Sequence, residues 1–568
     1  MRYVALATDY DGTLAAGGKA GESTKAALER FRDSGRRLIL VTGRRLDDLL
    51  EVFPEVELFD RVVAENGALL YHPSTKESKA LGEAPRKEFL DALSRKGVPF
   101  SVGRVIVATW EPHEAAVLEA IKDLGLELQV IFNKGAVMVL PEGLNKAAGL
   151  TAALDEMGLS PHNVVGVGDA ENDHAFLKLC ECSVAVANAL PMVKETAGLV
   201  TAKPRGEGVE ELIQLIIETD LKGVEGALQD RRILVGARSD GSKVTFPPDG
   251  SNLLIAGSSG AGKSTITIGL IERFAERGYQ FCLIDPEGDY LSLPGAVVLG
   301  DQHRAPTHEE VLQLLARPTQ SVVVNLTGIR LKERPEFFQS LLTRLLELRA
   351  ATGRPHWLVI DEAHHLLPEK WETAELVMPQ ELGGLILVTV HPVHLSPAVV
   401  KLIDAALAAG KDPEDTLRGF AQAAGLKEPG LSPVELQEGQ VLAWFLEEGL
   451  PFTVTTEAPR VEHHRHHRKY AEGRLGEEAA FYFRGPEKKL NLKAENLMRF
   501  VELAEGVDDD TWLHHLRRHD YSTWFRESIK DPDLAGEAEE IESHESLDPQ
   551  ASRRLMAEAV ERRYTVPE

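Results

Sequence analysis

Short apolar runs that end in polar turns recur along the first 460 residues of this chain, and amphipathic segments of helical length separate them. YVALATD, RLILVTG and NVVGVGD are three such runs, and each has the composition of a buried strand. Helical patterns such as TKAALERFRDSG lie between them. Strands that alternate with helices are typical of a parallel sheet with crossover helices. The sequence therefore predicts an α/β fold whose chemistry lies at the carboxyl ends of the strands.

The pattern divides the 568 residues into several units, as expected at about 150 residues per domain. The first α/β unit spans 1–221, and GEGVEELIQLIIETDL supplies its last helix. An insert at about 84–140 combines helices with the strands VGRVIVATW, ELQVIF and AVMVLP, so we expect a small α+β cap there. Residues 222–230 have the composition of a linker. A second α/β unit is expected at 231–460, and 461–568 join a basic, His-rich segment to helical patterns.

The composition excludes several classes of protein. Hydrophobic residues make up 43% and charged residues 27%, so the chain can bury packed cores. No apolar run reaches the roughly 18 residues of a membrane-spanning helix, and we identify no signal peptide. Three cysteines are too few for a disulfide framework and favour a cytoplasmic location. The net charge of −26 disfavours a surface that binds nucleic acid throughout, but it permits a local basic channel.

Polar residues follow the apolar runs of the first unit. DYDGTL places Asp9 and Asp11 two residues apart, directly after a run. Two carboxylates so placed can divide nucleophilic and acid–base work, although surface turns use the same residues. The other polar positions lie in similar contexts: Thr42 in VTGRR, Lys146 in PEGLNKAAGL, and Asp169, Asn172 and Asp173 in VGVGDAENDHAFL.

These four segments together resemble the haloacid dehalogenase superfamily and, more narrowly, its Cof-type phosphatases, which carry a cap after the second motif. VVAENGALLY and VAVANA add to the resemblance, which covers about residues 1–220. It implies that Asp9 attacks phosphorus and becomes an aspartyl phosphate. Asp11 would protonate the leaving group and then deprotonate the hydrolytic water. Thr42 and Lys146 would hold the transferring phosphoryl group, whose charge must be neutralised.

The resemblance also implies a Mg²⁺ site made by Asp9, the carbonyl of Asp11 and Asp169, with support from Asp173. Mg²⁺ prefers such hard oxygen ligands. The substrate depends on the cap, and this short cap resembles those of small sugar-phosphate or phosphoglycolate phosphatases. The alternative is a non-catalytic α/β unit whose carboxylates only end strands.

A glycine-rich turn separates a strand from a helix in the second unit. LLIAGSSGAGKST matches the pattern G-x-x-x-x-G-K-[ST] and precedes the helical pattern TITIGLIERFAERG. Glycines let backbone N–H groups approach phosphates. Lys263 would bridge the β- and γ-phosphates of ATP, and Ser264 would bind Mg²⁺. The expected ATP-binding positions in this turn are Gly257, Gly260, Gly262, Lys263, Ser264 and Thr265.

HWLVIDEAHHLLP supplies a second acidic pair after a strand. Asp361 would hold Mg²⁺ in its outer shell, and Glu362 would polarise the attacking water. The 98 residues from Lys263 to Asp361 suit a motor-type ATPase better than a small kinase. The strand GLILVTV ends at Thr389 and His391, where a γ-phosphate sensor would lie. The alternative is a fold that binds ATP without hydrolysing it.

These motifs, with LIDPEGDY and ILVGARSDGSKVTF, resemble the HerA/FtsK group of hexameric ATPases over about residues 231–475. The resemblance implies a ring with ATP sites between subunits and an arginine from the neighbour. Arg330, Arg344 and Arg354 are candidates for that arginine. The sensor in this group is usually a glutamine-type polar residue, whereas this sequence reads TVHPVHL, so either His391 takes that role or hydrolysis is slow.

The implied architecture is a Rossmann-like phosphatase domain with a small cap, a RecA-like P-loop ATPase domain and a mostly helical C-terminal region. HHRHHRKY (463–470) fits a solvated or intersubunit segment, a basic collar that meets phosphates, or a metal site. Aromatic and leucine side chains of the tail recur at helical spacings, which predicts a small helical core rather than stacking on bases. These residues are Phe481, Tyr482, Phe483, Leu497, Phe500, Trp512, Leu516 and Trp524.

Three functions fit these motifs. The first is a bifunctional enzyme, a Mg²⁺-dependent phosphatase joined to a ring-forming, hexameric ATPase in nucleic-acid processing or defence. Its partners would be double-stranded DNA and a phosphorylated small molecule, nucleotide or DNA end. The second is a metabolic sugar-phosphate or phosphoglycolate phosphatase with the ATPase as an assembly or regulatory module. The third, a polynucleotide end-healing enzyme with a kinase, is disfavoured by the acidic pair of the second unit.

Overall fold

The computed structural model describes the chain except for 224–230, 249, 259, 292, 369–381, 431–432, 461–474, 476–479, 530, 545–546 and 565–568. Most of the expected linker and the His-rich segment 463–470 therefore lie outside the described residues. Among the residues described, none of the helices combines the length and apolar character that crossing a bilayer requires.

The first unit is built on an eight-stranded sheet of order β14-β13-β12-β1-β4-β5-β6-β7. The three apolar runs described first form β1 (Ala5–Thr8), β4 (Arg37–Val41) and β12 (Val164–Gly168). β1 lies between the other two, and its pairing with both is parallel, which is the strand direction that was predicted. The remaining strands are β5 (Arg61–Ala64), β6 (Leu69–His72), β7 (Glu77–Ala80), β13 (Cys182–Ala185) and β14 (Leu199–Val200).

Helices cover this sheet in pairs. α1 (Glu22–Asp33) packs against α8 (Arg205–Thr219), and α5 (Lys146–Met157) packs against α6 (His174–Leu179). The other short elements are β2 (Ala15–Ala16), β3 (Lys19–Ala20), α2 (Leu46–Val52), η1 (Pro54–Leu58), η2 (Glu65–Gly67), η3 (Pro161–Asn163), η4 (Glu171–Asp173) and α7 (Pro191–Thr196). β1 and β12 are buried along their whole length and β4 is buried after Arg37, which is why these segments fold as central strands.

The insert forms a cap with a four-stranded antiparallel sheet of order β10-β11-β9-β8. One face of this sheet packs on two helices around Phe89, Val117 and Val139. The other face packs around Met138 and Leu140 and looks toward the core domain. The elements are α3 (Lys87–Arg95), β8 (Ser101–Val102), β9 (Val107–Trp110), α4 (Glu114–Leu124), β10 (Leu128–Asn133) and β11 (Ala136–Pro141).

VGRVIVATW, predicted to be one strand, is instead two strands joined by a turn. The buried carboxylate of Glu65 in the core domain accepts hydrogen bonds from the backbone N–H groups of Arg104, Val105 and Ile106, at 2.8, 2.8 and 3.0 Å. Three N–H groups turned toward one carboxylate cannot also lie in a straight strand. This contact also anchors the cap on the core domain.

The second unit contains an 11-stranded sheet of order β16-β15-β25-β24-β23-β17-β22-β21-β18-β20-β19. The seven strands from β23 to β19 are parallel, and the other four are antiparallel. The five predicted runs form β17 (Asn252–Gly257), β18 (Phe281–Asp285), β20 (Ser321–Asn325), β21 (Trp357–Ile360) and β22 (Leu385–Thr389). The other strands are β15 (Ile233–Ala237), β16 (Lys243–Phe246), β19 (Ala296–Leu299), β23 (Ala405–Ala409), β24 (Gln440–Phe445) and β25 (Phe452–Thr456).

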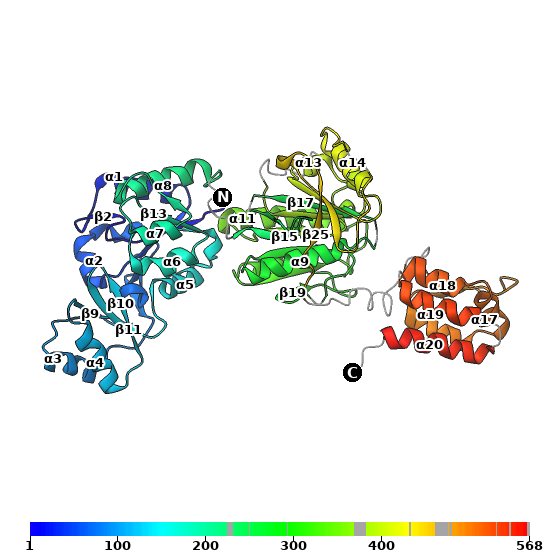
Figure 1. The fold of residues 1–568 in the computed structure, drawn as a ribbon, viewed down its shortest axis with the longest axis horizontal. Helices are drawn as coiled ribbons and strands as arrows, with labels where there is room; N and C mark the ends of the chain where they lie inside the picture. The colour runs from blue at the N-terminus through cyan, green and yellow to red at the C-terminus, as the bar shows by residue number, and fades with distance from the viewer. Residues whose placement is uncertain are drawn as a thin grey trace.

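Helices flank the parallel part of this sheet (Figure 1). The described elements are α9 (Lys263–Glu276), α10 (His308–Leu315), α11 (Arg334–Thr352), α12 (Ala363–Leu366), η7 (Pro392–His394), α13 (Pro397–Val400), α14 (Pro413–Ala424) and η8 (Leu446–Glu448). Two cores result, one on each side of the sheet, because alternate residues of every strand face opposite sides.

The C-terminal region has its own core of buried aromatic residues around Phe500, Trp512 and Tyr521. Phe481–Phe483 form the strand β26 rather than a helix, and β26 pairs with β27 (Leu492–Ala494). Phe481 and Phe483 both enter the core, which is the two-residue period of a strand. Because the rings of Phe500 and Trp512 are fully buried, they do not form a platform for bases. The helices are α16 (Leu497–Gly506), α17 (Asp509–Leu516), α18 (Asp520–Trp524), η9 (Phe525–Ile529), α19 (Pro532–Ser543) and α20 (Pro549–Tyr564).

The first two units contact each other at the amino ends of their strands. Asn163 directly precedes β12, and its amide donates to the Gly353 carbonyl at 3.3 Å. The Nε2 atom of His356, the residue before β21, lies 3.2 Å from the Asn163 Oδ1 atom. The Arg354 guanidinium donates to the Gly158 carbonyl at 2.7 Å. The carboxyl ends of both sheets therefore lie away from the contact.

Glu181 is the centre of a buried polar network in this contact. Its side chain is fully buried and accepts hydrogen bonds from Arg2 at 3.0 Å, Arg231 at 3.2 Å and the Tyr279 hydroxyl at 2.8 Å. The His162 Nδ1 atom lies 2.6 Å from its second oxygen. Burial by itself raises the pKa of Glu181, but the His162 hydrogen bond and the nearby positive charges outweigh burial and hold this pKa at about 2. The carboxylate is thus ionised and joins the two units.

Candidate active sites

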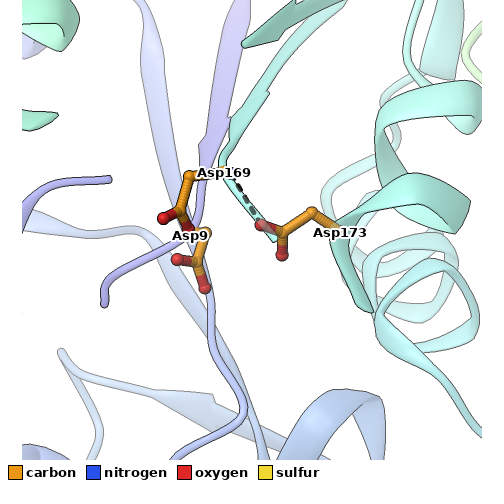
Figure 2. A group of neighbouring side chains, drawn as sticks. All are labelled: Asp9, Asp169 and Asp173. Atoms are coloured by element: carbon orange, nitrogen blue, oxygen red, sulfur yellow. Dashed lines mark hydrogen bonds between the residues drawn. The ribbon is translucent and has the colours of Figure 1, made fainter. Parts of the chain in front are cut away.

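Three carboxylates converge where β1 and β12 end (Figure 2). Among the described residues, oxygen atoms of Asp9, Asp169 and Asp173 lie within 4.8 Å of one another, and all three side chains are buried. Lys146 opens α5, and its Nζ atom lies 2.6 Å from Asp9 and 2.5 Å from Asp173. Asp173 also accepts the backbone N–H groups of Asp169 and Ala170, at 2.8 and 2.9 Å, which fixes its carboxylate.

The cluster has more negative charge than Lys146 can balance. Burial and the charge of Asp173 raise the pKa of Asp9 to about 7, although Lys146 opposes this shift. Burial is also the main cause of the raised pKa of Asp169. Lys146 remains a cation, because Asp173 and Asp9 raise its pKa by more than burial lowers it. A hard divalent cation among these oxygen atoms would relieve the repulsion, so the residues fit Mg²⁺.

Asp11 lies at the edge of the cluster, and its side chain points elsewhere. Both of its carboxylate oxygens accept from Arg44, at 2.6 and 2.7 Å, and the side chain is 46% exposed. Thr42 follows β4 and is buried, and its hydroxyl accepts the Arg44 backbone N–H at 3.1 Å. The two strand-end motifs thus meet through Arg44, which holds the Asp11 side chain outside the three-carboxylate cluster.

The cap reaches this cluster through Lys134, in the turn between β10 and β11. The Lys134 Nζ atom lies 2.7 Å from Asp169 Oδ2. Gly12 makes room for that carboxylate, since a Cβ atom at Gly12 would lie 2.2 Å from Asp169 Oδ2. Gly12 also has φ +90°, a conformation that favours glycine. Asn188 donates to the Gly12 carbonyl at 2.9 Å and closes this side of the site.

The glycine-rich turn of the second unit lies between β17 and α9, as the motif requires. Gly260 and Gly262 have φ values of +79° and +84°, so the turn needs glycine at both positions. The Nζ atom of Lys263 donates to the carbonyls of Gly257 and Ser258, at 2.9 and 3.0 Å. Ser264 and Thr265 follow in the first turn of α9.

The acidic pair lies two strands away from this turn, because β22 separates β17 from β21. Asp361 is buried directly after β21. Glu362 has φ +43°, an uncommon conformation for a residue with a side chain, and such strain is frequent at functional sites. Its carboxylate lies 3.5 Å from His364 Nδ1, and the Thr389 hydroxyl at the end of β22 lies 3.2 Å from the same atom.

His391, predicted to be the γ-phosphate sensor, lies at an exposed position after β22. Its backbone N–H donates to the Thr389 hydroxyl at 3.2 Å. The histidine between Glu362 and Thr389 is His364, which sequence reasoning missed. Burial and the charges of neighbouring histidines lower the pKa of His364 to about 4, so it is neutral at pH 7.

The structure removes one candidate for the arginine that reaches a neighbouring subunit. Arg354 is fully buried and donates to Leu315, Ala316 and Gly158 carbonyls of its own chain, so it cannot extend to another subunit. Arg330 and Arg344 are exposed or partly exposed and pair with neighbouring glutamates.

Three contributors to the first site were missed by sequence reasoning. Arg44 lies in VTGRR, two residues after Thr42, and this position was the available sign that a cation lies near Asp11. Lys134 lies in the cap, and Glu65 of the core domain holds backbone N–H groups of the cap, so both roles depend on how the cap meets the core domain. Sequence spacing gives no measure of that approach.

The first unit is similar to known hydrolases. A profile of the haloacid dehalogenase-like hydrolase family matches residues 6–105 and 105–213. A phosphoglycolate phosphatase of Methanothermobacter thermautotrophicus is 32% identical over 220 residues, which cover 37% of this chain and 97% of that protein. Phosphoglycolate phosphatase 2 of Saccharolobus solfataricus is 28% identical over 221 residues, which cover 38% of this chain and 92% of that protein.

A further relative is named for a different substrate. The 5-amino-6-(5-phospho-D-ribitylamino)uracil phosphatase of Bacillus subtilis is 23% identical over 259 residues, which cover 37% of this chain and 96% of that protein. All three proteins are matched over nearly their whole length, and each match spans little more than a third of this chain.

Proposed function

Because this chain belongs, through residues 6–213, to the haloacid dehalogenase-like hydrolases, we propose that it hydrolyses a phosphate monoester through an aspartyl phosphate on Asp9. The observation that carries the proposal is the position of Asp9. It lies at the end of the central strand β1, between a buried lysine and two further buried carboxylates. The proposed substrate is a small phosphorylated metabolite, since the relatives are named for such compounds.

The reaction proceeds through two successive displacements at phosphorus. An oxygen of Asp9 forms a bond to phosphorus while the bond to the alcohol oxygen breaks, and Asp11 gives that oxygen a proton. Water then attacks the phosphorus of the aspartyl phosphate and returns its proton to Asp11, which frees Asp9. Lys146 and Thr42 orient the phosphoryl group and stabilise its charge. Asp11 must turn from Arg44 toward the leaving group before it can transfer a proton.

Asp9, Asp169 and the carbonyl of Asp11 would hold Mg²⁺, and Asp173 would fix the loop behind them. When bound, the cation offsets the negative charge on the phosphoryl oxygens. The backbone N–H groups held by Asp173 keep Asp169 turned toward Asp9. The cap turn that carries Lys134 contacts the site through Asp169.

Hydrolysis by Asp9→Asn tests this proposal. The purified variant should release no phosphate from a panel of phosphate monoesters in the presence of Mg²⁺, because the amide is a poor nucleophile. Asp47→Asn, an exposed carboxylate on α2, is the matched control and should retain full activity. Undiminished phosphate release by the Asp9→Asn variant would refute the assignment of the nucleophile.

We further propose that the second unit binds and hydrolyses ATP. The support is the convergence of Lys263, Asp361 and Glu362 at the carboxyl ends of parallel strands, where nucleotide sites lie in such sheets. The strand order places one strand between the turn of Lys263 and the acidic pair. In this proposal the ATPase assembles as a hexamer with ATP sites between subunits. Double-stranded DNA is the polymer that it moves or senses.

Two variants and one mass measurement test the second proposal. Lys263→Ala should lose ATP binding, and Glu362→Gln should bind ATP without hydrolysing it. Mass photometry should find hexamers, and double-stranded DNA should stimulate ATP hydrolysis. A hexamer that ignores DNA would favour the alternative, in which the ATPase is an assembly or regulatory module for a sugar-phosphate or phosphoglycolate-type phosphatase. A strict monomer would overturn the ring.

A further inference from the structure

The turn that joins β10 to β11 has a lysine at a position that does not suit one. Asn133 pairs with Ala136, so Lys134 and Gly135 form a two-residue turn. Their φ values are +48° and +84°, and positive φ at both positions is the pattern of a type I′ turn, which prefers asparagine and glycine. A lysine with positive φ is uncommon, and such conformations are frequent at functional sites. The turn itself therefore does not account for a lysine at this position.

The side chain of Lys134 crosses from the cap to the proposed metal ligands of the core domain. Its Nζ atom lies 2.7 Å from Asp169 Oδ2. A Cβ atom on Gly12 would lie 3.1 Å from the same Nζ atom. Gly12 directly follows Asp11, whose carbonyl is another proposed ligand of Mg²⁺. The lysine nitrogen is thus bound to one proposed metal ligand and lies next to the residue that follows a second one.

The two partners of this ion pair differ in how firmly they are held. The side chain of Asp169 is 2% exposed, whereas that of Lys134 is 46% exposed. Asp169 also follows β12 directly, at the centre of the sheet. The lysine can therefore leave the contact by rotating into solvent, while the aspartate stays in place.

The charges of the cluster favour one further cation at Asp169 rather than two. In their ionised forms, the three buried carboxylates are balanced in part by Lys146, which leaves two negative charges. A divalent cation balances both of them. If Lys134 also stayed, the cluster would become positive before substrate binds, and the ammonium group and the metal would repel each other at one carboxylate. Binding of the metal therefore favours departure of the lysine.

Departure of Lys134 would release the far end of the cap sheet. Val107 pairs with Val139 at the end of the sheet where the chain enters and leaves the cap. Glu65 holds the cap at this end, through the backbone just before β9. The Lys134 turn lies at the opposite end, where its ion pair with Asp169 adds a second attachment to the core domain. Loss of that ion pair leaves the end held by Glu65 in place.

We propose that Lys134 competes with Mg²⁺ for Asp169 Oδ2, and that its release couples metal binding to the position of the cap. This inference rests on the metal site of the proposed phosphatase. Lys134 holds the carboxylate before the cation binds and leaves it when the cation arrives. The β10–β11 turn then moves more freely and opens the site to substrate. Lys134 is thus a positioning residue that lowers the metal affinity of the site.

Isothermal titration calorimetry with Mg²⁺ and the full-length protein, without nucleotide, tests this competition. Lys134→Asn removes the charge and places in the turn a residue that the turn prefers, so the variant should fold as well as wild type. It should bind Mg²⁺ about tenfold more tightly, the size of one lost hydrogen bond between charged groups. Lys134→Arg keeps the charge and should bind Mg²⁺ as wild type does. Lys122→Gln, which removes an exposed lysine of the cap helix α4, is the control and should leave the affinity unchanged.

Hydrogen exchange measures the position of the cap without any turnover. In the wild type, saturating Mg²⁺ should accelerate exchange in the β10–β11 hairpin, because the turn loses its ion pair with Asp169. In Lys134→Asn the hairpin should exchange fast from the start, and Mg²⁺ should change its exchange little. Slower exchange of the wild-type hairpin on addition of Mg²⁺ would overturn the coupling to the cap.

The outcomes separate this inference from the function on which it rests. Asp169→Asn identifies the heat that belongs to this site, since that heat should disappear in the variant. Asp169-dependent binding of Mg²⁺ that is equal or weaker in Lys134→Asn overturns the competition and leaves the phosphatase intact. Binding of Mg²⁺ that does not depend on Asp169 overturns the metal site, and with it both the competition and the proposed chemistry.

Discussion

Replacing Glu181 with glutamine removes one negative charge from the buried contact between the first two units. The carboxylate accepts hydrogen bonds from Arg2, Arg231 and Tyr279. It also lies close to the Nδ1 atom of His162. Its pKa falls from 4.5 to about 2 on folding, and such a shift corresponds to about 3 kcal/mol of stability at pH 7. Glu181→Gln should therefore lower the free energy of unfolding by about 3 kcal/mol at pH 7.

The same shift fixes how this loss depends on pH. A depressed pKa stabilises the fold fully above the unfolded value of 4.5, and the stabilisation disappears as the pH falls toward 2. The difference between wild type and Glu181→Gln should therefore be constant from pH 7 to pH 5. It should fall to about half of its full value near pH 3.

Urea unfolding, followed by far-ultraviolet circular dichroism at pH 7, 5 and 3, measures this difference. Glu29→Gln, an exposed position on α1, is the matched control and should change stability by no more than about 0.5 kcal/mol. An unchanged stability at pH 7 would refute the reasoning. A loss of the same size at pH 3 as at pH 7 would show that packing, rather than the charge of Glu181, is responsible.

Three further results are expected. Gly12→Ala should abolish phosphatase activity while the chain stays folded, because its Cβ atom would lie 2.2 Å from Asp169 Oδ2. Circular dichroism measures the folding and a phosphate-release assay measures the activity. Full activity would contradict this geometry. Chelation of Mg²⁺ by EDTA should stop phosphate release and excess Mg²⁺ should restore it, whereas turnover that survives EDTA would exclude the metal site. Glu65→Ala should loosen the cap, since three backbone N–H groups lose their acceptor. Hydrogen exchange at Arg104–Ile106 should then accelerate. Protection equal to that of wild type would show that Glu65 does not anchor the cap.

The positions of Asp9 and Asp169 were predictable because apolar runs identify central strands and parallel strands end at one edge. The role of Glu181 was not, since KLCECSVAV gives no sign that its glutamate would be buried against another unit. The prediction that VGRVIVATW forms one continuous strand was wrong because Glu65, about 40 residues earlier in the chain, bends the backbone there. His364 was missed because the sequence shows two adjacent histidines without showing which one faces Thr389.

Because the two units contact each other through the amino ends of their strands, the two proposed active sites lie at the ends of the sheets that face away from the contact. β12 and β18 each have five residues that rise by about 3.3 Å apiece, so each site lies about 17 Å from the contact along its own sheet. A molecule released at one site must diffuse through bulk solvent before it reaches the other, where a competing enzyme can intercept it. Any influence of one site on the other must instead be mechanical. It would pass through α9, which begins at Lys263 and ends beside His162 at the contact, and through the strands that run from the contact to each site.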